Sequence, residues 1–448
     1  MGRREFSRRK FLRTSAVATA AFTIVRASAV RTYAANEKVN VACVGVGSMG
    51  AGNRRELKDI STIVALCDVD SNTLAAAAKE HPAAKQWADF REMLEKQQKE
   101  IDAVMVSTPD HIHFPAAMLA MKLGKGVDVE KPMAHTVWEA RQMAAAAQKY
   151  KVATQMDNEN HSADGLRSLV EWIKADAIGA VREVHIWTDR PIWPQGIAQR
   201  PASKPVPPNV NWDLWIGPAP FRDYHEHLHP FQWRGWWDFG CGALGDMGCH
   251  FFDSAFWALE LGSPTTIEAV QEGNSKETGP KWAIITYEFP ARKGKGGPQE
   301  GKDLPPVNMK WYDGHKQPPR PEELEADRKM PPNGSLFVGE KGKILVSDAS
   351  SPRLIPESKM QEYKRPEPFL GRIKGGHKQD WLNAVKGGPP AGCDFALYGG
   401  PLAEVVLLGN VAVRWGKKIE WDAANLRAKN ALEADQYLRR EYRKGWEF

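Results

Sequence analysis

The chain has 448 residues, 42% of them hydrophobic and 26% charged, which is typical of a soluble globular protein large enough for two domains. Its formal net charge of +6 is concentrated at the amino terminus, because residues 1–35 hold eight Arg and Lys residues and a single acidic residue, Glu5. The rest of the chain carries about −1. The composition therefore argues against a nucleic-acid binder, which needs a basic surface.

The first 35 residues predict an export signal. A twin-arginine motif, Ser7-Arg8-Arg9-Lys10-Phe11-Leu12, precedes a run of small and apolar residues at 14–25, and Ala27-Ser28-Ala29 is a candidate cleavage site. The run is too short and too weakly apolar for a convincing membrane span, and the alternative is a basic disordered tail. We expect the twin-arginine export machinery to carry the folded protein to the periplasm, with the signal either cleaved or retained as an anchor.

Residues 37–160 have the pattern of a nucleotide-binding domain. Strand-like runs alternate with helix-like runs, which predicts a doubly wound parallel sheet of the Rossmann type that binds ligands at the carboxyl ends of its strands. We expect strands at 39–44, 63–66, 102–107, 126–129 and 152–155, and helices at 74–79, 89–96, 115–123 and 136–149.

The first strand leads into a glycine-rich turn of the form G-x-G-x-x-G, Gly45-Val46-Gly47-Ser48-Met49-Gly50. Such glycines let the backbone approach a pyrophosphate, which then faces the amino terminus of the next helix. Asp68 follows the second strand, where a carboxylate would bind ribose hydroxyls. No Arg or Lys stands in residues 68–72 to meet a 2′-phosphate, so NAD is favoured over NADP as the cofactor.

Polar clusters follow three later strands, at the sheet edge where a nicotinamide and its substrate would lie. A single polar residue at such a position is often only a cap, but three clusters beside a dinucleotide motif favour a site. We expect the first two clusters to contact the cofactor and the last to contact the substrate. The clusters are Thr108, Pro109 and His113, then Glu130 and Lys131, and finally Asn158 and His161.

Residues 161–448 predict a second α/β domain. The segment 191–220 is rich in Pro and Trp and is expected to be irregular, with 211–218 folding over the site. We expect strands at 181–187, 282–289, 307–311, 336–338, 343–346 and 418–421, helices at 377–385 and 402–413, and a charged helix within 425–448.

The stretch 236–253 joins a glycine-rich turn to two ionisable residues. Asp246 and His250 are four residues apart, so they would share one face of a helix that opens near Gly245. Asp246 would lie in the first turn, where the helix dipole favours negative charge. An imidazole beside a carboxylate has the properties of a general base; the alternative is an Asp cap and a buried His on an amphipathic helix.

Tryptophans, histidines and cysteines near this stretch and elsewhere offer further candidate site residues. Trp236 and Trp237 stand beside this turn and are expected to wall a sugar pocket, although tryptophans more often fill a core. Three alternating histidines at 225, 227 and 229 could face one metal ion, but no Cys or Glu stands at a diagnostic spacing, so no metal site is predicted. The five scattered cysteines argue against a disulfide framework.

Three motifs together resemble the Gfo/Idh/MocA family of oxidoreductases, over about residues 37–425. They are the glycine motif at 45–50, Glu130-Lys131-Pro132 with Glu139, and Gly245-Asp246-Met247-Gly248-Cys249-His250. The resemblance implies a second domain with a large, mainly antiparallel open sheet, often used for oligomer contacts, so a homodimer or homotetramer is expected. It also implies that Lys131 lies between cofactor and substrate, often before a cis peptide bond, and that Asp246 and His250 complete the catalytic set.

We therefore expect an NAD(P)-dependent oxidoreductase that acts on a secondary alcohol of a sugar, glycoside or polyol. His250 would take the hydroxyl proton, Asp246 would orient the imidazole, and Lys131 would stabilise the alkoxide. The alternative is an NAD-dependent glycosidase that works by transient oxidation, elimination and re-reduction. Free NAD is scarce outside the cytoplasm, so export favours a tightly bound cofactor in either case. A third class, a non-catalytic sugar-binding protein, is disfavoured by the intact set of motif residues.

Overall fold

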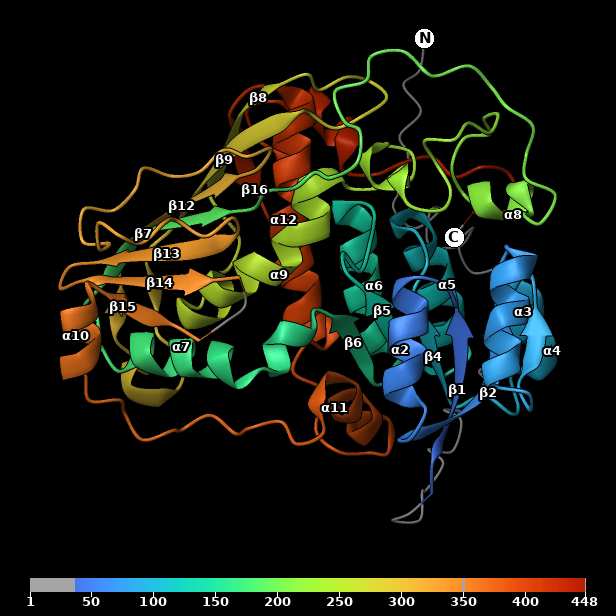
Figure 1. Cartoon of the computed structure of the whole chain (residues 1–448), viewed down its shortest axis with the longest axis horizontal. Helices are drawn as coiled ribbons and strands as arrows, with labels where there is room; N and C mark the ends of the chain where they lie inside the picture. Colours follow the sequence, from blue (N-terminus) through green and yellow to red (C-terminus); the bar gives the residue numbers. More distant parts are fainter. Residues whose placement is uncertain (1–36, 349–350, 448) are drawn as a thin grey trace, which may run out of the picture. The chain divides into compact units, whose positions relative to one another are not determined.

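The computed structural model describes residues 37–348 and 351–447, and the predicted export signal lies outside them. The described chain opens with a six-stranded parallel sheet in the order β3-β2-β1-β4-β5-β6 (Figure 1). The change of direction between β1 and β4 creates the crevice that binds dinucleotides in sheets of this topology. The strands are β1 (Val39–Val44), β2 (Ser61–Cys67), β3 (Lys85–Trp87), β4 (Ala103–Val106), β5 (Gly126–Glu130) and β6 (Thr154–Asp157).

Local sequence explains where several helices of this domain begin. The Asp70 side chain caps α3 by accepting from two backbone N–H groups of its first turn. Thr136 and Glu139 form a reciprocal capping box at the start of α6. The helices are α2 (Met49–Leu57), α3 (Ser71–Glu80), α4 (Phe90–Gln97), α5 (Asp110–Lys122) and α6 (Val137–Tyr150), which confirms the predicted alternation.

The start of α5 differs from the prediction. The expected helix began at Pro115, but α5 begins at Asp110 and Pro115 lies inside it. Pro115 has no N–H to give to the carbonyl of His111. That carbonyl instead accepts a hydrogen bond from Arg440 Nη2, at 2.6 Å. Arg440, which is distant in sequence, therefore supplies the hydrogen bond that Pro115 cannot give to this carbonyl.

A second, nine-stranded sheet has the order β15-β14-β13-β7-β12-β9-β8-β16-β17. Only the β7–β12 pair is parallel, so the prediction of a mainly antiparallel sheet is confirmed. Its strands are β7 (Val181–Trp187), β8 (Thr266–Glu272), β9 (Trp282–Phe289), β12 (Val307–Tyr312), β13 (Gly334–Gly339), β14 (Lys343–Ser347), β15 (Arg353–Ile355), β16 (Ile419–Asp422) and β17 (Arg427–Ala428). A separate two-stranded sheet pairs β10 (Arg292–Lys293) with β11 (Asp303–Leu304).

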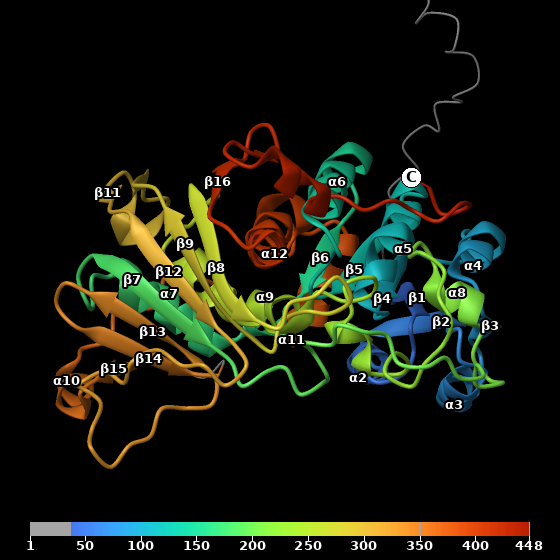
Figure 2. The same cartoon turned by 90° about the horizontal axis from the view of Figure 1, so that it is seen from above.

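Helices cover one face of the nine-stranded sheet (Figure 2). Helix α9 (Gly242–Ala258) packs against β7 and β13, and α12 (Gly400–Trp415) packs against β8 and β9. Alternate residues of β9 are buried on this side, as expected for a half-buried strand. The remaining helices are α7 (Asp164–Lys174), α8 (Trp212–Ile216), α10 (Glu357–Glu362) and α11 (Gly376–Val385).

Helix α12 and the turn before it are strongly apolar. Among the described residues, the stretch Phe395–Trp415 has the length and composition of a membrane span, but 72% of its most apolar window is buried inside the protein. It packs against α6, α9 and the strands of the second sheet. Its apolar character is thus explained by a place in the core.

The prediction of a charged helix within 425–448 is wrong. This region forms the short strand β17, a 3₁₀ turn at Leu432–Tyr437, and a last stretch without regular structure. We call residues 439–447 the tail. Two of its charged side chains make long-range bonds: Arg440 bonds to Glu139 of the first domain, and Arg443 bonds to Asp213 of α8.

The segment between β7 and α9, residues 188–241, leaves the second sheet and reaches the first domain (Figure 1). We call it the strap. It is mostly irregular, as predicted, apart from α8 and a 3₁₀ turn at Gln232–Gly235. Backbone hydrogen bonds tie it to the end of β2: Asn211 N donates to Val69 O at 2.9 Å, and Ser71 N donates to Asn209 O at 2.8 Å. The strap therefore covers the carboxyl ends of the parallel strands.

Candidate active site

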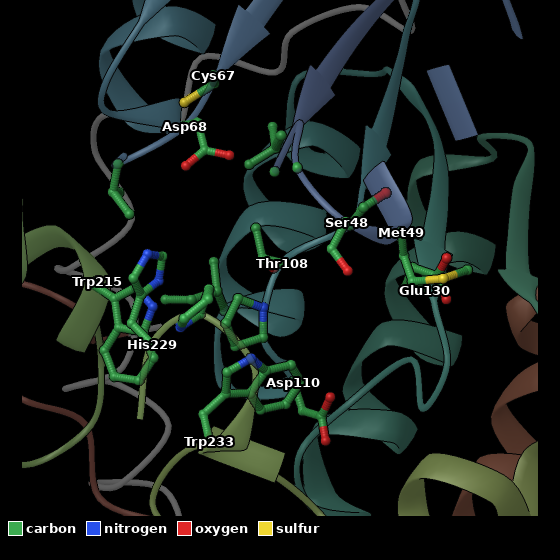
Figure 3. A pocket seen from close by; sticks show the side chains of 18 of the residues that line it. Ser48, Met49, Cys67, Asp68, Thr108, Asp110, Glu130, Trp215, His229 and Trp233 are labelled. Atoms are coloured by element: carbon green, nitrogen blue, oxygen red, sulfur yellow. The ribbon is translucent and has the colours of Figure 1, made fainter. Parts of the chain in front are cut away.

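A cleft of about 1240 Å³, counted to its open mouth, runs along the carboxyl ends of the parallel strands. Figure 3 shows Asp68 toward one end of it, Asp110 toward the other, and Trp215, His229 and Trp233 of the strap along one wall. The predicted cofactor-binding residues that line it are Gly45, Gly47, Ser48, Met49, Asp68, Thr108, Pro109, Glu130 and Lys131.

The glycine-rich turn packs so closely that side chains would not fit. A Cβ on Gly45, whose φ is +79°, would lie 2.5 Å from Ser107 O, and a Cβ on Gly50 would lie 2.1 Å from Gly45 O. Ser48 precedes α2 without forming a side-chain cap. Within the described chain, no side chain caps the amino terminus of α2, so its backbone N–H groups can bind an anion. The turn and this helix end together fit the pyrophosphate of a dinucleotide.

Asp68 lies at the end of β2, as predicted. Its Oδ2 accepts from Val46 N and its Oδ1 from Asp70 N, both at 2.9 Å. Burial raises the pKa of this carboxyl, and the two backbone bonds oppose that rise. Among the described residues that line the cleft, only Lys131 and Arg234 are Lys or Arg, and both contact Asp246. No such cation meets a 2′-phosphate beside Asp68, which fits NAD better than NADP.

Lys131 and Asp246 meet from opposite domains. Lys131 Nζ donates to the backbone carbonyl of Asp246 at 2.6 Å and to its Oδ1 at 3.2 Å. The Lys131–Pro132 bond is cis, as the resemblance implies. Burial alone would lower the pKa of Lys131, but the Asp246 and Glu130 carboxylates outweigh it and the pKa is raised. Burial would likewise raise the pKa of Asp246, but Lys131 and Arg234 hold it below its ordinary value.

His250 lies one helical turn beyond Asp246 on α9. Burial, reinforced by the charge of Lys131, lowers the pKa of His250 to about 3, so the ring is neutral at physiological pH. Its Nδ1 is buried and has no hydrogen-bond partner among the described residues. Asp246 bonds to Lys131 and Arg234 and, within the described part of the chain, not to His250. The structure thus corrects the expectation that Asp246 orients the imidazole, and Asp246 lies beyond the first turn because α9 begins at Gly242.

Two further carboxyls line the cleft near Lys131. Burial raises the pKa of Asp110 to about 7; its Oδ2 accepts from Cys241 N at 2.9 Å. Burial, together with the charge of Asp157, raises the pKa of Glu130 to about 8; its Oε1 accepts from Asn53 Nδ2 at 2.9 Å. The site therefore holds two carboxyls with raised pKa beside a charged Lys–Asp pair.

Some predicted contact residues lie under the cleft and do not line it. Both ring nitrogens of His113 lie 2.8 Å from backbone carbonyls, those of Pro132 and Thr108, so His113 supports the loop that carries Lys131. Asn158 Nδ2 donates to Asp253 Oδ2 at 3.0 Å, and His161 Nδ1 lies 2.9 Å from Asp253 Oδ1. Because these side chains are buried and already paired, the cofactor role of His113 and the substrate roles of Asn158 and His161 are not supported.

The predicted aromatic walls are also corrected. Trp236 is fully buried against the ring of His225, and Trp237 packs in the main core with its Nε1 donating to Asn274 Oδ1. Of the tryptophans near this turn, Trp233 lines the cleft instead. The 3₁₀ turn at Gln232–Gly235 determines which tryptophan ring faces the cleft. This turn has no periodic pattern in the sequence, so the ring could not be predicted.

The three histidines of the strap do not converge. His227 Nδ1 lies 2.5 Å from Gln232 Oε1, and His229 Nε2 lies 3.2 Å from Asp70 Oδ2. In the part of the chain that the structure describes, no three His, Cys, Asp or Glu side chains are arranged to hold a metal ion.

Sequence reasoning missed several residues of the cleft. Arg234 Nε lies 3.3 Å from Asp246 Oδ1, and the guanidinium lies 4.4 Å from the ring centroid of Trp233 and 4.5 Å from that of Phe231. The signal was a single Arg within an aromatic run beside the predicted catalytic turn. Trp446, near the carboxyl terminus, also lines the cleft, and nothing in its local sequence points there.

Two protein-family models match the chain. The family model described as "Oxidoreductase family, NAD-binding Rossmann fold" (GFO_IDH_MocA) matches residues 39–158, and its companion for the C-terminal alpha/beta domain matches residues 187–293. Together the two matches cover about half of the chain.

Individual relatives match over shorter stretches. A glycosyl hydrolase family 109 protein of Saccharopolyspora erythraea is 31% identical over 149 residues, which is 31% of this chain and 32% of the relative. An inositol 2-dehydrogenase/D-chiro-inositol 3-dehydrogenase of Lacticaseibacillus casei is 31% identical over 156 residues, 33% of this chain and 44% of the relative. The matches thus span less than half the length of these curated relatives.

Solved structures share the fold over much more of the chain. The WlbA dehydrogenase of Bordetella pertussis, crystallised with NADH and UDP-GlcNAcA, has a TM-score of 0.58 at 18% identity. The comparison covers 86% of this chain and 99% of that one. At this identity the likeness establishes the fold.

Proposed function

This chain belongs to the Gfo/Idh/MocA oxidoreductase family, and from that premise we propose that it oxidises a secondary alcohol of a sugar, glycoside or polyol with NAD. The observation that carries the proposal is the pair of Lys131 and Asp246, joined across the two domains at the nicotinamide end of a dinucleotide cleft. Gly45, Gly47 and the amino terminus of α2 would hold the pyrophosphate, and Asp68 the adenosine ribose. A bound nicotinamide supplies the hydride acceptor.

The chain's own residues would position the alcohol and handle its proton. Lys131, held charged by Asp246, would donate a hydrogen bond to the hydroxyl oxygen and stabilise the alkoxide as it forms. His250 is neutral and would accept the proton, although it lies one turn along α9 from Asp246 and is not among the described residues that line the cleft. Arg234 and Lys131 share the single carboxylate of Asp246, which leaves net positive charge where the alkoxide develops.

Transient oxidation by a glycosidase is the second candidate, and it rests on the likeness to a glycosyl hydrolase family 109 protein. Oxidation of a ring carbon acidifies the neighbouring C–H, so loss of the aglycone, addition of water across the resulting double bond and return of the hydride to the ketone would use the same Lys131 and His250. Both reactions need the same cleft, and they differ in stoichiometry.

Reaction stoichiometry tests the proposal. Purified protein is incubated with NAD and a panel of polyols, free sugars and nitrophenyl glycosides, and NADH and nitrophenol are followed together. A dehydrogenase forms one NADH per sugar oxidised; a glycosidase releases nitrophenol with no net NADH. Lys131→Met should lower either rate on the order of 10²–10⁴-fold, and Lys149→Met, at an exposed position on α6, should not. Equal rates in both variants would contradict the proposed site.

We also propose export through the twin-arginine pathway and a homo-oligomer. The export proposal is supported by the Arg8-Arg9 motif. The oligomer proposal is supported by the family and by the partly exposed second face of the nine-stranded sheet, where Val270 is 61% exposed. Replacing both arginines with Lys should abolish transport to the periplasm, measured by cell fractionation. A monomer by light scattering would contradict the oligomer.

A further inference from the structure

The Asp68 end of the cleft is built from three separate parts of the chain. Strand β3 pairs with β2, so the residues that follow β3 lie beside Asp68. Phe90 lines the cleft there, together with Leu214 and Trp215 of the strap and Trp446 of the tail. In this topology the adenosine half of a dinucleotide lies over β1 and β2. The three parts therefore surround the expected position of the adenine.

Trp446 is the residue that the tail contributes to this group. It is only 5% exposed, although it is near the carboxyl terminus, where chains usually fray. Its ring centroid lies 5.9 Å from that of Phe90, and the Arg91 guanidinium lies 4.0 Å from its ring centroid. Arg91 is itself fixed by Asp89, with its Nη2 at 2.6 Å from Oδ2. The indole is thus held against α4 at the edge of the cleft.

Buried polar contacts fasten the first half of the tail to the first domain. Arg440 Nε lies 2.8 Å from Glu139 Oε1, and its Nη2 donates to His111 O, the carbonyl left open by Pro115. Tyr442 OH donates to the same Glu139 oxygen at 2.6 Å. Glu139 is fully buried, so these bonds are shielded from water. Figure 2 shows the tail continuing from this region toward α4.

Arg443 joins the tail to the strap. Its backbone N donates to Pro218 O and its Nε to Gly217 O, both at 2.9 Å. Its guanidinium also bonds to both the carbonyl and the carboxylate of Asp213, which lies in α8. The strap is tied on its other side to Asp70, which accepts from Asn209 Nδ2 at 2.8 Å. The tail therefore clamps the strap over the ribose end of the cleft.

We propose that the tail is a latch for the cofactor: Trp446 walls the adenine site, and Arg443 holds the strap closed over the bound dinucleotide. This inference rests on the proposed function, namely that the cleft binds NAD. Adenine is flat and aromatic, so it suits a site bounded by indole and phenyl rings. A cofactor enclosed in this way leaves only when tail and strap move, which suits an enzyme that works where free NAD is scarce.

The rate of cofactor release tests the latch. Full-length protein loaded with NADH is mixed with excess NAD, and loss of bound NADH fluorescence is followed by stopped flow. Trp446→Ala and Arg443→Gln should each release NADH on the order of 10–100-fold faster. Lys444→Ala, at the exposed position between them, should release it at the wild-type rate. Trp446→Phe, which keeps an aromatic ring, should recover most of the slow release.

Reduced nicotinamide mononucleotide, which lacks the adenosine half, separates the latch from general damage. Its affinity should be the same in wild type, Trp446→Ala and Arg443→Gln. Unchanged NADH release in both variants would overturn the latch while leaving NAD binding intact. An equal loss of mononucleotide affinity would also overturn it, because the variants would then act on the whole cleft. Wild-type protein that binds neither nucleotide would defeat the proposed function itself.

Discussion

Gly50 and Gly52 stand two residues apart at the start of α2, yet their surroundings differ completely. A Cβ on Gly50 would lie 2.1 Å from the backbone oxygen of Gly45, whereas a Cβ on Gly52 would come no nearer than 3.9 Å to the flexible end of Arg55. Gly50 therefore shapes the phosphate-binding turn, and Gly52 does not. The G-x-G-x-x-G motif in the sequence includes Gly50 and does not include Gly52.

We expect Gly50→Ala to weaken NAD binding more than tenfold, because the turn must shift away from its phosphate-binding shape. Gly52→Ala should leave the affinity unchanged and stabilise the fold by about 0.5–1 kcal/mol, since alanine is the better helix former. Titration calorimetry with NAD and thermal unfolding measure the two effects. Equal affinity for NAD in wild type and Gly50→Ala would contradict this role of the turn.

Glu130 makes the stability depend on pH. Burial raises its pKa from 4.5 to about 8, so between these values the folded protein holds a proton that the unfolded chain has lost. The stabilisation from this proton is fully present below the unfolded-state pKa of 4.5. It is lost as the pH rises through the folded-state pKa of about 8. Glu130→Gln mimics the protonated form and should remove this loss.

Urea unfolding at about pH 6 and about pH 8.5 measures this effect. The free energy of unfolding should fall about 2 kcal/mol more in wild type than in Glu130→Gln over that interval. Glu159→Gln, at an exposed position, should behave as wild type. Parallel pH dependence in wild type and Glu130→Gln would show that Glu130 does not hold the extra proton.

At the level of single residues, the sequence predicts which polar groups follow a strand. It does not predict the direction in which a side chain points. Asp68 and Lys131 were predicted because a strand ends immediately before each. Trp233, Trp236 and Trp237 stand within five residues of one another, but only the first lines the cleft. The direction of each ring depends on an irregular turn and on distant partners such as His225 and Asn274.

At the scale of elements, helix α11 of the second half of the chain is anchored beneath the parallel sheet. Lys378 on α11 is 2% exposed and bonds to Asp128 of β5, with Nζ 3.2 Å from Oδ2, and to Asp157 of β6. Burial would lower the pKa of Lys378, but the surrounding carboxylates outweigh it and the pKa is raised. The ammonium thus neutralises charge that would otherwise be isolated under the active site.

Replacing this ammonium should unfold the protein more readily. Lys378→Met leaves the carboxylates of β5 and β6 buried without their cation, and should cost about 3–5 kcal/mol of the free energy of unfolding. Lys374→Met, at an exposed position just before α11, should cost less than about 0.5 kcal/mol. Denaturant unfolding compares the two. A loss below about 1 kcal/mol in Lys378→Met would show that the carboxyls are neutral or solvated without it.

Elements with a clear period were predicted well from the sequence. Strands β7 and β9 match their predicted bounds; alternate residues of β9 are buried, whereas β7 is exposed only near its start and its last four residues are buried. Strand β3 was missed because three mostly exposed residues carry no period. The tail was predicted as a helix from its charge, but its Arg residues bond to Glu139, Gly217 and Asp213, partners hundreds of residues away.

At the scale of the whole molecule, the active site exists only where two domains meet. Lys131 follows β5 of the parallel sheet, and Asp246 lies on α9, which packs on the antiparallel sheet. The sequence predicted Lys131 from its place after a strand and Asp246 from its spacing to His250, but it did not show that Asp246 would pair with Lys131 and Arg234 in place of His250. That pairing depends on the approach of two chain segments, which no local pattern encodes.

A double-mutant cycle on Lys131 and Asp246 tests this cross-domain pair most directly, with the single-turnover rate of alcohol oxidation by NAD-loaded enzyme as the readout. If the pair acts as one unit, Lys131→Met and Asp246→Asn each slow the reaction on the order of 10²–10⁴-fold, and the double variant is within about tenfold of the slower single variant. A double variant slowed by the full product of the two effects, or a single variant with near-normal turnover, would contradict the account.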